Sequence, residues 1–276
     1  MGYATIMVQV QNEPPAEARL ECALGLARSF GATLIGVGVE SMRPLIFDNG
    51  MVAMEAEWFN ALRDIAQNNI KAAKDTFAKA TAGAGVEAIW EEGLDMPVQA
   101  LARASRAADL VVAGYGPDNR NDPYRDAAPT DLALASGRPV LMVPQVAAPL
   151  EARRVLLAWK DTREARRAMS DAMPFLKKAE DVLVLEVGGR EDLANAETRV
   201  ASVVQALERH AVKARAKAMT CHEHETSGQI EKEARAFGAD LLVAGAYGHS
   251  RLGEWVFGGV TQHLADRRDC YVLFSH

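Results

Sequence analysis

Three glycines in the last part of the chain have a spacing that suits the binding of an anion. Gly245, Gly248 and Gly258 form the pattern G-x2-G-x9-G, and the apolar run 241–244 before them has the length of a buried strand. Glycine lets backbone N–H groups approach phosphate oxygens closely, and the start of a following helix adds a favourable dipole. The pattern predicts a phosphate-binding loop that leads into a helix beginning at Gly258. Tight turns of an α/β fold are the alternative explanation.

Polar side chains next to these glycines are further candidates for contacts with a phosphate. An arginine at position 251 can bind an oxyanion through two parallel hydrogen bonds. Exposure to solvent without a ligand explains Arg251 equally well. The hydroxyl of Thr261 falls in the first turn of the expected helix. The candidate residues that accompany the three glycines are His249, Ser250, Arg251, Gly259, Val260 and Thr261.

The glycine spacing resembles the nucleotide-binding loop of the universal stress protein family, which reads G-x2-G-x9-G followed by Ser or Thr. All three glycines match this pattern. The next residue departs from it, because Gly259 stands where the nucleotide-binding members carry a hydroxyl. Thr261 is the nearest hydroxyl that could replace it, from a different direction along the backbone.

A second run resembles the family sequence W-D-G-S-R-E-A, in which the aspartate contacts the nucleoside. Here it reads WKDTREA, so Lys160 and Asp161 follow Trp159 in place of Asp and Gly. A lysine can pair with phosphate but cannot accept a hydrogen bond from ribose or adenine. A solvated turn with Thr162 as a helix N-cap is the alternative. The resemblance also implies an apolar contact with the base from the end of the next strand, at Val187.

The first half of the chain lacks an intact loop of this kind. The glycines of the run 114–116 are too close together, and Asp118, Asp122 and Asp126 follow them. Three carboxylates would repel a triphosphate unless Mg²⁺ intervened. We therefore expect the first half to be structural and to form a pseudo-dimer with the second half inside one chain.

Other clusters of reactive side chains give weaker signals. The run CHEHE at 221–225 offers Cys, His and Glu side chains that could ligate zinc, but no second ligand pair follows with a suitable spacing. We interpret this run as a polar loop and expect no metal site. No Ser-His-Asp or Cys-His arrangement can be argued either, because no nucleophile-elbow sequence is present. We therefore assign no catalytic residue.

Strand and helix patterns alternate along the whole chain. In the first half, apolar strand patterns are separated by helical ones, in the order βαβαβαβαβ. The expected strands are 5–10, 33–39, 86–90, 109–114 and 139–143, and the expected helices are 16–29, 51–82, 97–107 and 129–135. In the second half the expected strands are 154–159, 182–187, 213–218, 240–244 and 271–274, and the expected helices are 162–176, 193–210, 228–237 and 260–267.

The two halves repeat each other. The run 107–114, AADLVVAG, resembles 237–245, FGADLLVAG, and a short linker at 144–152 separates the halves. Buried strands that alternate with helices imply a parallel, doubly wound sheet. The resemblance implies two tandem flavodoxin-like, Rossmann-like α/β domains of the adenine nucleotide alpha hydrolase type, at residues 1–146 and 152–276. Each is expected to hold a five-stranded parallel sheet with helices on both faces.

Composition narrows the class of protein. Of the 276 residues, 49% are hydrophobic and 25% are charged, and the net charge is -6. These values are typical of a globular protein and argue against nucleic acid or an anionic membrane as a partner. The N-terminus begins directly with a strand pattern rather than a secretion signal, so we expect a cytoplasmic protein. Three cysteines are too few for a disulfide framework.

Family resemblance implies a stress-response role through the binding of ATP or another adenine nucleotide, with Mg²⁺ on its phosphates. Two alternatives remain open: an interaction protein without nucleotide, acting through its domain and dimer surfaces toward an unknown partner, and a weak ATPase with Asp161 near Mg²⁺. No general base supports the ATPase, so we do not expect an enzyme beyond weak hydrolysis. In this family last strands often pair, which makes 140–143 and 272–274 the expected meeting edges and a homodimer an expectation.

Overall fold

The computed structural model describes most of the chain as two compact units. The N-terminal unit is Tyr3–Ser136, and the C-terminal unit is Gly137–His276, to which Gly2 also belongs. Each unit is described here by itself. The described residues are 2–12, 14–42, 56–114, 123–124, 126–144, 149–189, 192–247, 259–266 and 270–276.

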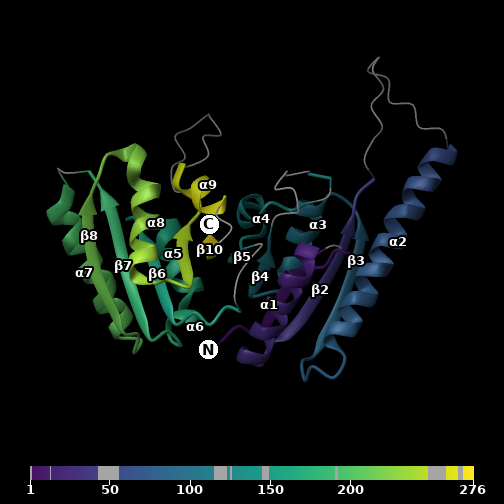
Figure 1. Cartoon of the computed structure of the whole chain (residues 1–276), viewed down its shortest axis with the longest axis horizontal. Helices are drawn as coiled ribbons and strands as arrows, with labels where there is room; N and C mark the ends of the chain where they lie inside the picture. The colour runs from purple at the N-terminus through teal and green to yellow at the C-terminus, as the bar shows by residue number, and fades with distance from the viewer. Residues whose placement is uncertain are drawn as a thin grey trace, which may run out of the picture. The chain divides into compact units, whose positions relative to one another are not determined.

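In the N-terminal unit, four parallel strands lie in the order β3-β2-β1-β4 (Figure 1). The strands are β1 (Thr5–Gln9), β2 (Thr33–Glu40), β3 (Ala88–Leu94) and β4 (Leu110–Ala113). The helices are α1 (Pro14–Phe30), α2 (Ala56–Thr81), α3 (Pro97–Ala104) and α4 (Pro129–Ser136), and a short 3-10 helix, Ser105–Ala107, follows α3. Helices α2 and α3 cover opposite faces, because Gly36 lies against Phe77 of α2 whereas Val37 lies beside α3.

In the C-terminal unit, the strands lie in the order β5-β10-β9-β6-β7-β8. The strands are β5 (Val140–Met142), β6 (Arg154–Trp159), β7 (Asp181–Gly188), β8 (Ala214–Thr220), β9 (Leu241–Gly245) and β10 (Tyr271–Ser275). The helices are α5 (Arg163–Asp171), α6 (Met173–Leu176), α7 (Leu193–Glu208), α8 (Thr226–Phe237) and α9 (Gly259–Ala265), with a 3-10 turn at Glu223–Glu225. The five strands from β10 to β8 are parallel, as the sequence predicts for this half.

Strand β5 runs antiparallel to β10, and this pairing confirms the prediction that the last strands of the two halves meet. Leu141 is opposite Leu273 at the centre of the pairing. Because β5 falls within the C-terminal unit, the N-terminal unit taken by itself holds four parallel strands. The predicted domain limits, 146 and 152, stay predictions.

Two equivalent aspartates show that the halves are a structural repeat. Asp109 accepts hydrogen bonds from the backbone N–H groups of Ala4 and Thr5, at 2.8 and 3.1 Å. Asp240 accepts in the same way from Arg153 and Arg154, at 2.8 and 3.0 Å. Each aspartate directly precedes the fourth strand of its half. Each one also accepts hydrogen bonds from the backbone at the start of the first strand of that half. Thr5 and Arg154 are therefore equivalent, and the strand registers extend this correspondence to the other strands.

Local sequence explains most elements, and two of them differ from the prediction in an instructive way. The expected helix 162–176 divides at Ala172 into α5 and α6, since Pro174 cannot continue an α-helical hydrogen-bond ladder. Strand β3 extends to Leu94 although it carries exposed glutamates, because it is an edge strand paired to β2 along its length. In the described part of the chain, no helix has both the length and the apolar character needed to cross a membrane.

Candidate functional site

The predicted site residues that the structure describes lie where the C-terminal sheet changes direction. The chain runs from β6 through β7 to β8 and then returns to β9 on the other side of β6. In open α/β sheets, ligands bind at the carboxyl ends of strands at such a switch point. Ala158 pairs with Ala244, so the loop of Lys160 and Asp161 begins beside Gly245. Five predicted site residues lie outside the described residues: Gly248, His249, Ser250, Arg251 and Gly258.

Gly245 is required for close packing between β9 and α5. A β-carbon at this position would lie 2.7 Å from the backbone nitrogen of Ala165 and 2.7 Å from the carbonyl carbon of Glu164. The first turn of α5 thus lies directly against the strand end. Thr162 is the N-cap of α5, as the alternative interpretation of this run expects, and its hydroxyl oxygen accepts a hydrogen bond from the Ala165 N–H at 3.3 Å. The exposed Asp161 forms an ion pair with Arg166 at 2.5 Å.

The first backbone amides after Gly245 already have partners. The N–H of Ala246 donates to the carbonyl of Ser275 at 2.8 Å. The N–H of Tyr247 donates to the Thr261 hydroxyl at 3.3 Å, and Tyr247 has a left-handed φ of 59°. Thr261 therefore connects α9 to the start of the glycine loop. Its hydroxyl oxygen already accepts a hydrogen bond from the chain. Phosphate contacts at this corner depend on groups other than these two amides.

Glu164 places a buried carboxylate beside this corner. Its side chain is 7% exposed and pairs with the Arg163 guanidinium at 2.5 Å. Burial raises the pKa of Glu164, but hydrogen bonds from Arg163, from its own backbone N–H and from the Thr162 hydroxyl outweigh burial and leave that pKa below its ordinary value. The carboxylate is therefore charged at neutral pH. Its negative charge already compensates the positive, N-terminal end of the α5 dipole.

We expect Glu164→Gln to lower the free energy of unfolding by about 1–2 kcal/mol at pH 7, because charge-assisted hydrogen bonds are lost. The folded-state pKa of Glu164 lies below the unfolded value of about 4.3, so its contribution is fully present above that pH and disappears as the pH falls through the folded-state pKa. Urea unfolding of both proteins at pH 7 and pH 3 measures this difference. A penalty of equal size at the two pH values would contradict it.

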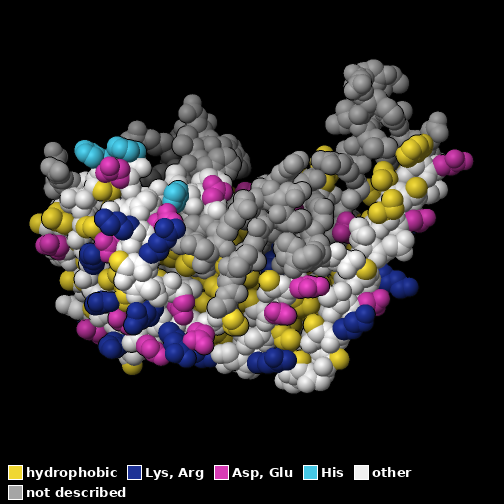
Figure 2. All heavy atoms as spheres, viewed as in Figure 1, with side chains coloured by type: hydrophobic (Ala, Val, Ile, Leu, Met, Phe, Trp, Pro, Cys, Tyr) yellow, Lys and Arg dark blue, Asp and Glu magenta, His cyan; other side chains and the backbone are white. Residues whose placement is uncertain are grey.

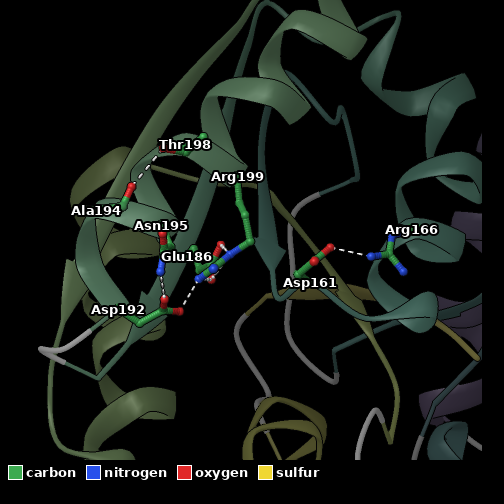
Figure 3. Close-up of polar contacts among 8 residues, drawn as sticks. All are labelled: Asp161, Arg166, Glu186, Asp192, Ala194, Asn195, Thr198 and Arg199. Atoms are coloured by element: carbon green, nitrogen blue, oxygen red, sulfur yellow. Dashed lines mark hydrogen bonds and ion pairs between the residues drawn. The ribbon is translucent and has the colours of Figure 1, made fainter.

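A second buried carboxylate lies at the end of β7, next to the predicted site residue Val187. Figure 3 shows Glu186 and Asp192 both directed toward Arg199 of α7. Arg199 donates to Glu186 through Nε at 3.0 Å and Nη2 at 2.5 Å, and to Asp192 at 2.5 Å. These carboxylates, Glu186 first, raise the pKa of Arg199, and Arg199 lowers the pKa of Asp192. The network therefore connects α7 to the carboxyl-terminal end of β7.

The N-terminal unit has the same switch point, between β1 and β4, and Arg19 fills it. Arg19 of α1 is 2% exposed. It donates to the carbonyl of Gly114 at 3.3 Å and to the side-chain oxygen of Gln11 at 2.5 Å, and these residues follow β4 and β1. Asp126 is also buried, whereas Asp118 and Asp122 lie outside the described residues. A buried guanidinium at this position favours the prediction that the first half is structural.

Sequence reasoning missed the three buried charged residues Arg19, Glu164 and Glu186. Glu186 had a usable signal, because a charge inside the apolar run VLVLEV must find a partner if the strand is buried. Arg19 lies next to Leu20 on the apolar side of its helix, which is a weaker signal. Nothing local distinguishes Glu164 from an exposed helix residue.

The two histidines of the run 221–225 lie side by side. The rings of His222 and His224 stack with their centroids 5.7 Å apart. Among the residues that the structure describes, no three or more His, Cys, Asp or Glu side chains are grouped so that they could hold a metal ion. His263, on α9, contacts Glu231 at 3.2 Å instead.

Comparisons with known proteins give the family of the second half and the fold of the whole. Residues 151–276 match the model of the universal stress protein family. The crystal structure of a universal stress protein from Archaeoglobus fulgidus DSM 4304 is similar with a TM-score of 0.73 at 13% identity, covering 99% of this chain and 98% of that one. A functionally unknown protein from Pseudomonas aeruginosa PAO1 is similar with a TM-score of 0.62 at 17% identity, covering 99% and 92%.

The similarity is therefore of two kinds. No curated protein sequence matches the chain. At identities of 13% and 17%, the two solved structures show the fold, and their coverage shows that it extends over both halves. The family model reports on the sequence itself, over residues 151–276. Residues 151–276 therefore match the universal stress protein family, and along its whole length the chain has the α/β fold of the Archaeoglobus protein.

Proposed function

We propose that this chain is a stress-response regulator that binds ATP or another adenine nucleotide in its C-terminal unit, with Mg²⁺ accompanying the phosphates. The observation that carries the proposal is the switch point between β6 and β9, where the loop of Lys160 begins beside the start of the glycine loop. Lys160 would pair with a phosphate. Gly245, Gly259 and Thr261 would shape the loop around the anion.

Trp159, the last residue of β6, gives independent support. The residue is 8% exposed, and its indole Nε1–H has no hydrogen-bond acceptor within the described residues. Buried donors are almost always paired with protein, water or ligand. An acceptor on a bound nucleoside would satisfy this donor, and Val187 would contribute an apolar contact from the neighbouring strand.

Titration with ATP and Mg²⁺ tests this proposal. We expect ATP to raise the melting temperature of the wild-type protein. Lys160→Glu should weaken ATP binding about tenfold or more, because it replaces a cation beside the phosphates with an anion. Isothermal titration calorimetry measures both affinities.

Lys213→Glu is the matched control for Lys160→Glu. It makes the same charge change at the opposite, amino-terminal end of the same sheet, just before β8, and should leave the affinity unchanged. Absence of any response of the wild-type protein to ATP would refute nucleotide binding. Equal losses in the two variants would show that only the overall charge matters and would remove Lys160 from the site.

A second function, interaction with another protein without nucleotide, is favoured by two observations. The amides of Ala246 and Tyr247 are already paired inside the chain. In addition, Figure 2 shows hydrophobic side chains gathered on α2, where Trp58 is 59% exposed and Ile65 57%. Exposed apolar clusters of this kind mark interaction surfaces. A melting temperature that ATP leaves unchanged would favour this function over the first.

A further inference from the structure

A groove of about 470 Å³ lies in the N-terminal unit between α3 and the carboxyl-terminal halves of β2 and β3. This volume falls in the range of about 300–1,000 Å³ that is typical of small-molecule sites. In its lining Ala107 is exposed and Ala100 and Ala104 are partly exposed, so apolar surface there remains uncovered. The apolar lining consists of Val37, Val39, Leu94, Ala100, Ala104 and Ala107.

The groove exists because the N-terminal unit has a glycine at a position where the C-terminal unit has a large side chain. Gly93 pairs with Val39 on β2, and the equivalent residue of the C-terminal unit is Met219, which pairs with Val187 on β7. Met219 reaches α8, where the amide nitrogen of Gln229 lies 3.6 Å from its sulfur. A β-carbon on Gly93 would meet nothing within 4 Å. The space that Met219 fills in the C-terminal unit is therefore open in the N-terminal unit.

The charge at the groove also differs between the halves. Glu91 lines the groove, and its equivalent is Lys217, which is paired with Glu233 of α8 at 2.5 Å. Within the described residues Glu91 is exposed and has no hydrogen bond or ion pair. The other two carboxylates of the groove are engaged, Asp95 with Arg103 and Glu92 with Lys74.

These features define the chemistry of a ligand. A hydrocarbon or aromatic body would occupy the space beside Gly93 and cover the alanines of the lining, where apolar surface is uncovered. A positive group would pair with Glu91, the carboxylate that the described residues leave without a partner. Arg103 is held by Asp95, and Arg106 donates through Nε to the carbonyl of Arg103 at 2.7 Å. A carboxylate on the ligand would lie near Glu91 and be repelled.

The geometry points to a second binding site, in the N-terminal unit, for a small organic cation with an apolar body. The site is formed by α3, β2 and β3, and it is separate from the nucleotide site proposed for the other unit. The ammonium group of the ligand pairs with Glu91, and its body occupies the space beside Gly93. The site binds its ligand whether or not the C-terminal unit binds a nucleotide.

Three probes of one shape test the charge preference. The full-length protein is titrated with 2-phenylethylamine, with the neutral 2-phenylethanol and with the anionic 3-phenylpropanoate, and backbone amide signals are followed by NMR. We expect saturable shifts at residues 91–95 and 100–107, with the amine binding about two- to fivefold more tightly than the alcohol and the anion more weakly than both. Equal affinities of the three probes, or shifts confined to other elements, would overturn the proposal.

Two pairs of variants place the site. Gly93→Met should abolish the saturable shifts by filling the groove, whereas Gly228→Met, on the open surface of α8, should leave them unchanged. Glu91→Gln should reduce the affinity for the amine to that for the alcohol, whereas Glu197→Gln, the same change on α7, should not. An unchanged melting temperature confirms that Gly93→Met is folded. Amine binding that survives Gly93→Met would overturn the proposal.

Discussion

Gly245→Ala is expected to destabilise the C-terminal unit by roughly 2–3 kcal/mol, although it adds one methyl group to a strand end. The added carbon would lie 2.7 Å from two backbone atoms of α5, and backbone cannot move aside as a flexible side chain can. Either α5 shifts away from β9 or the strand end distorts. Urea unfolding followed by circular dichroism measures the loss.

Gly228→Ala is the control for Gly245→Ala. Its added carbon meets nothing within 4 Å, and it removes a glycine from a helix. It should therefore stabilise the protein by about 0.5–1 kcal/mol. Equal stabilities of Gly245→Ala and the wild type would show that α5 does not lie against β9. The presence of glycine at position 245 would then be explained by the loop alone.

Arg199→Met should cost about 3 kcal/mol of unfolding free energy, because it leaves Glu186 as a buried carboxylate without its cation. The side chain of Glu186 is 7% exposed, and that of Arg199 is 26% exposed. Adding Glu186→Gln to Arg199→Met should recover much of this loss, since the unpaired buried charge is then removed. Urea unfolding of the two single variants and the double variant gives the coupling energy directly.

The neighbouring pair of Arg166 and Asp161, also drawn in Figure 3, is the matched control. Its side chains are 55% and 51% exposed, and solvent screens the attraction between them. Arg166→Met should therefore cost less than about 1 kcal/mol. If both arginine variants cost the same, burial does not distinguish the two pairs, and the account of Glu186 is wrong.

Local sequence patterns predicted the order and type of the elements in both halves. The apolar runs of β1, β4, β7 and β9 have strand length and are bounded by turn residues, and they are buried in the structure. The predicted helix 228–237 ends at Phe237 as expected, and the next residue, Gly238, adopts the left-handed conformation that favours glycine. These features depend on neighbouring residues, which the sequence displays directly.

The candidate site could be predicted only in part. The spacing of the glycines and the run that begins at Trp159 indicated which loops meet, since both follow strands whose carboxyl ends lie at one edge of the sheet. The sequence could not indicate that Thr261 bonds to the Tyr247 amide, because that contact joins residues from two separate elements. Nor could it indicate that Arg19 fills the equivalent corner of the first half.

The sequence by itself determined the α/β repeat, the positions of its strands and helices, and the resemblance of its second half to a nucleotide-binding family. Each of these follows from periodicity, turn residues or spacing within a short stretch of chain. Only the tertiary structure decided which charges are buried, which amides are already paired, and where Gly93 leaves a groove that Met219 fills in the other half. These outcomes depend on side chains from elements far apart in the chain, and no local pattern encodes them.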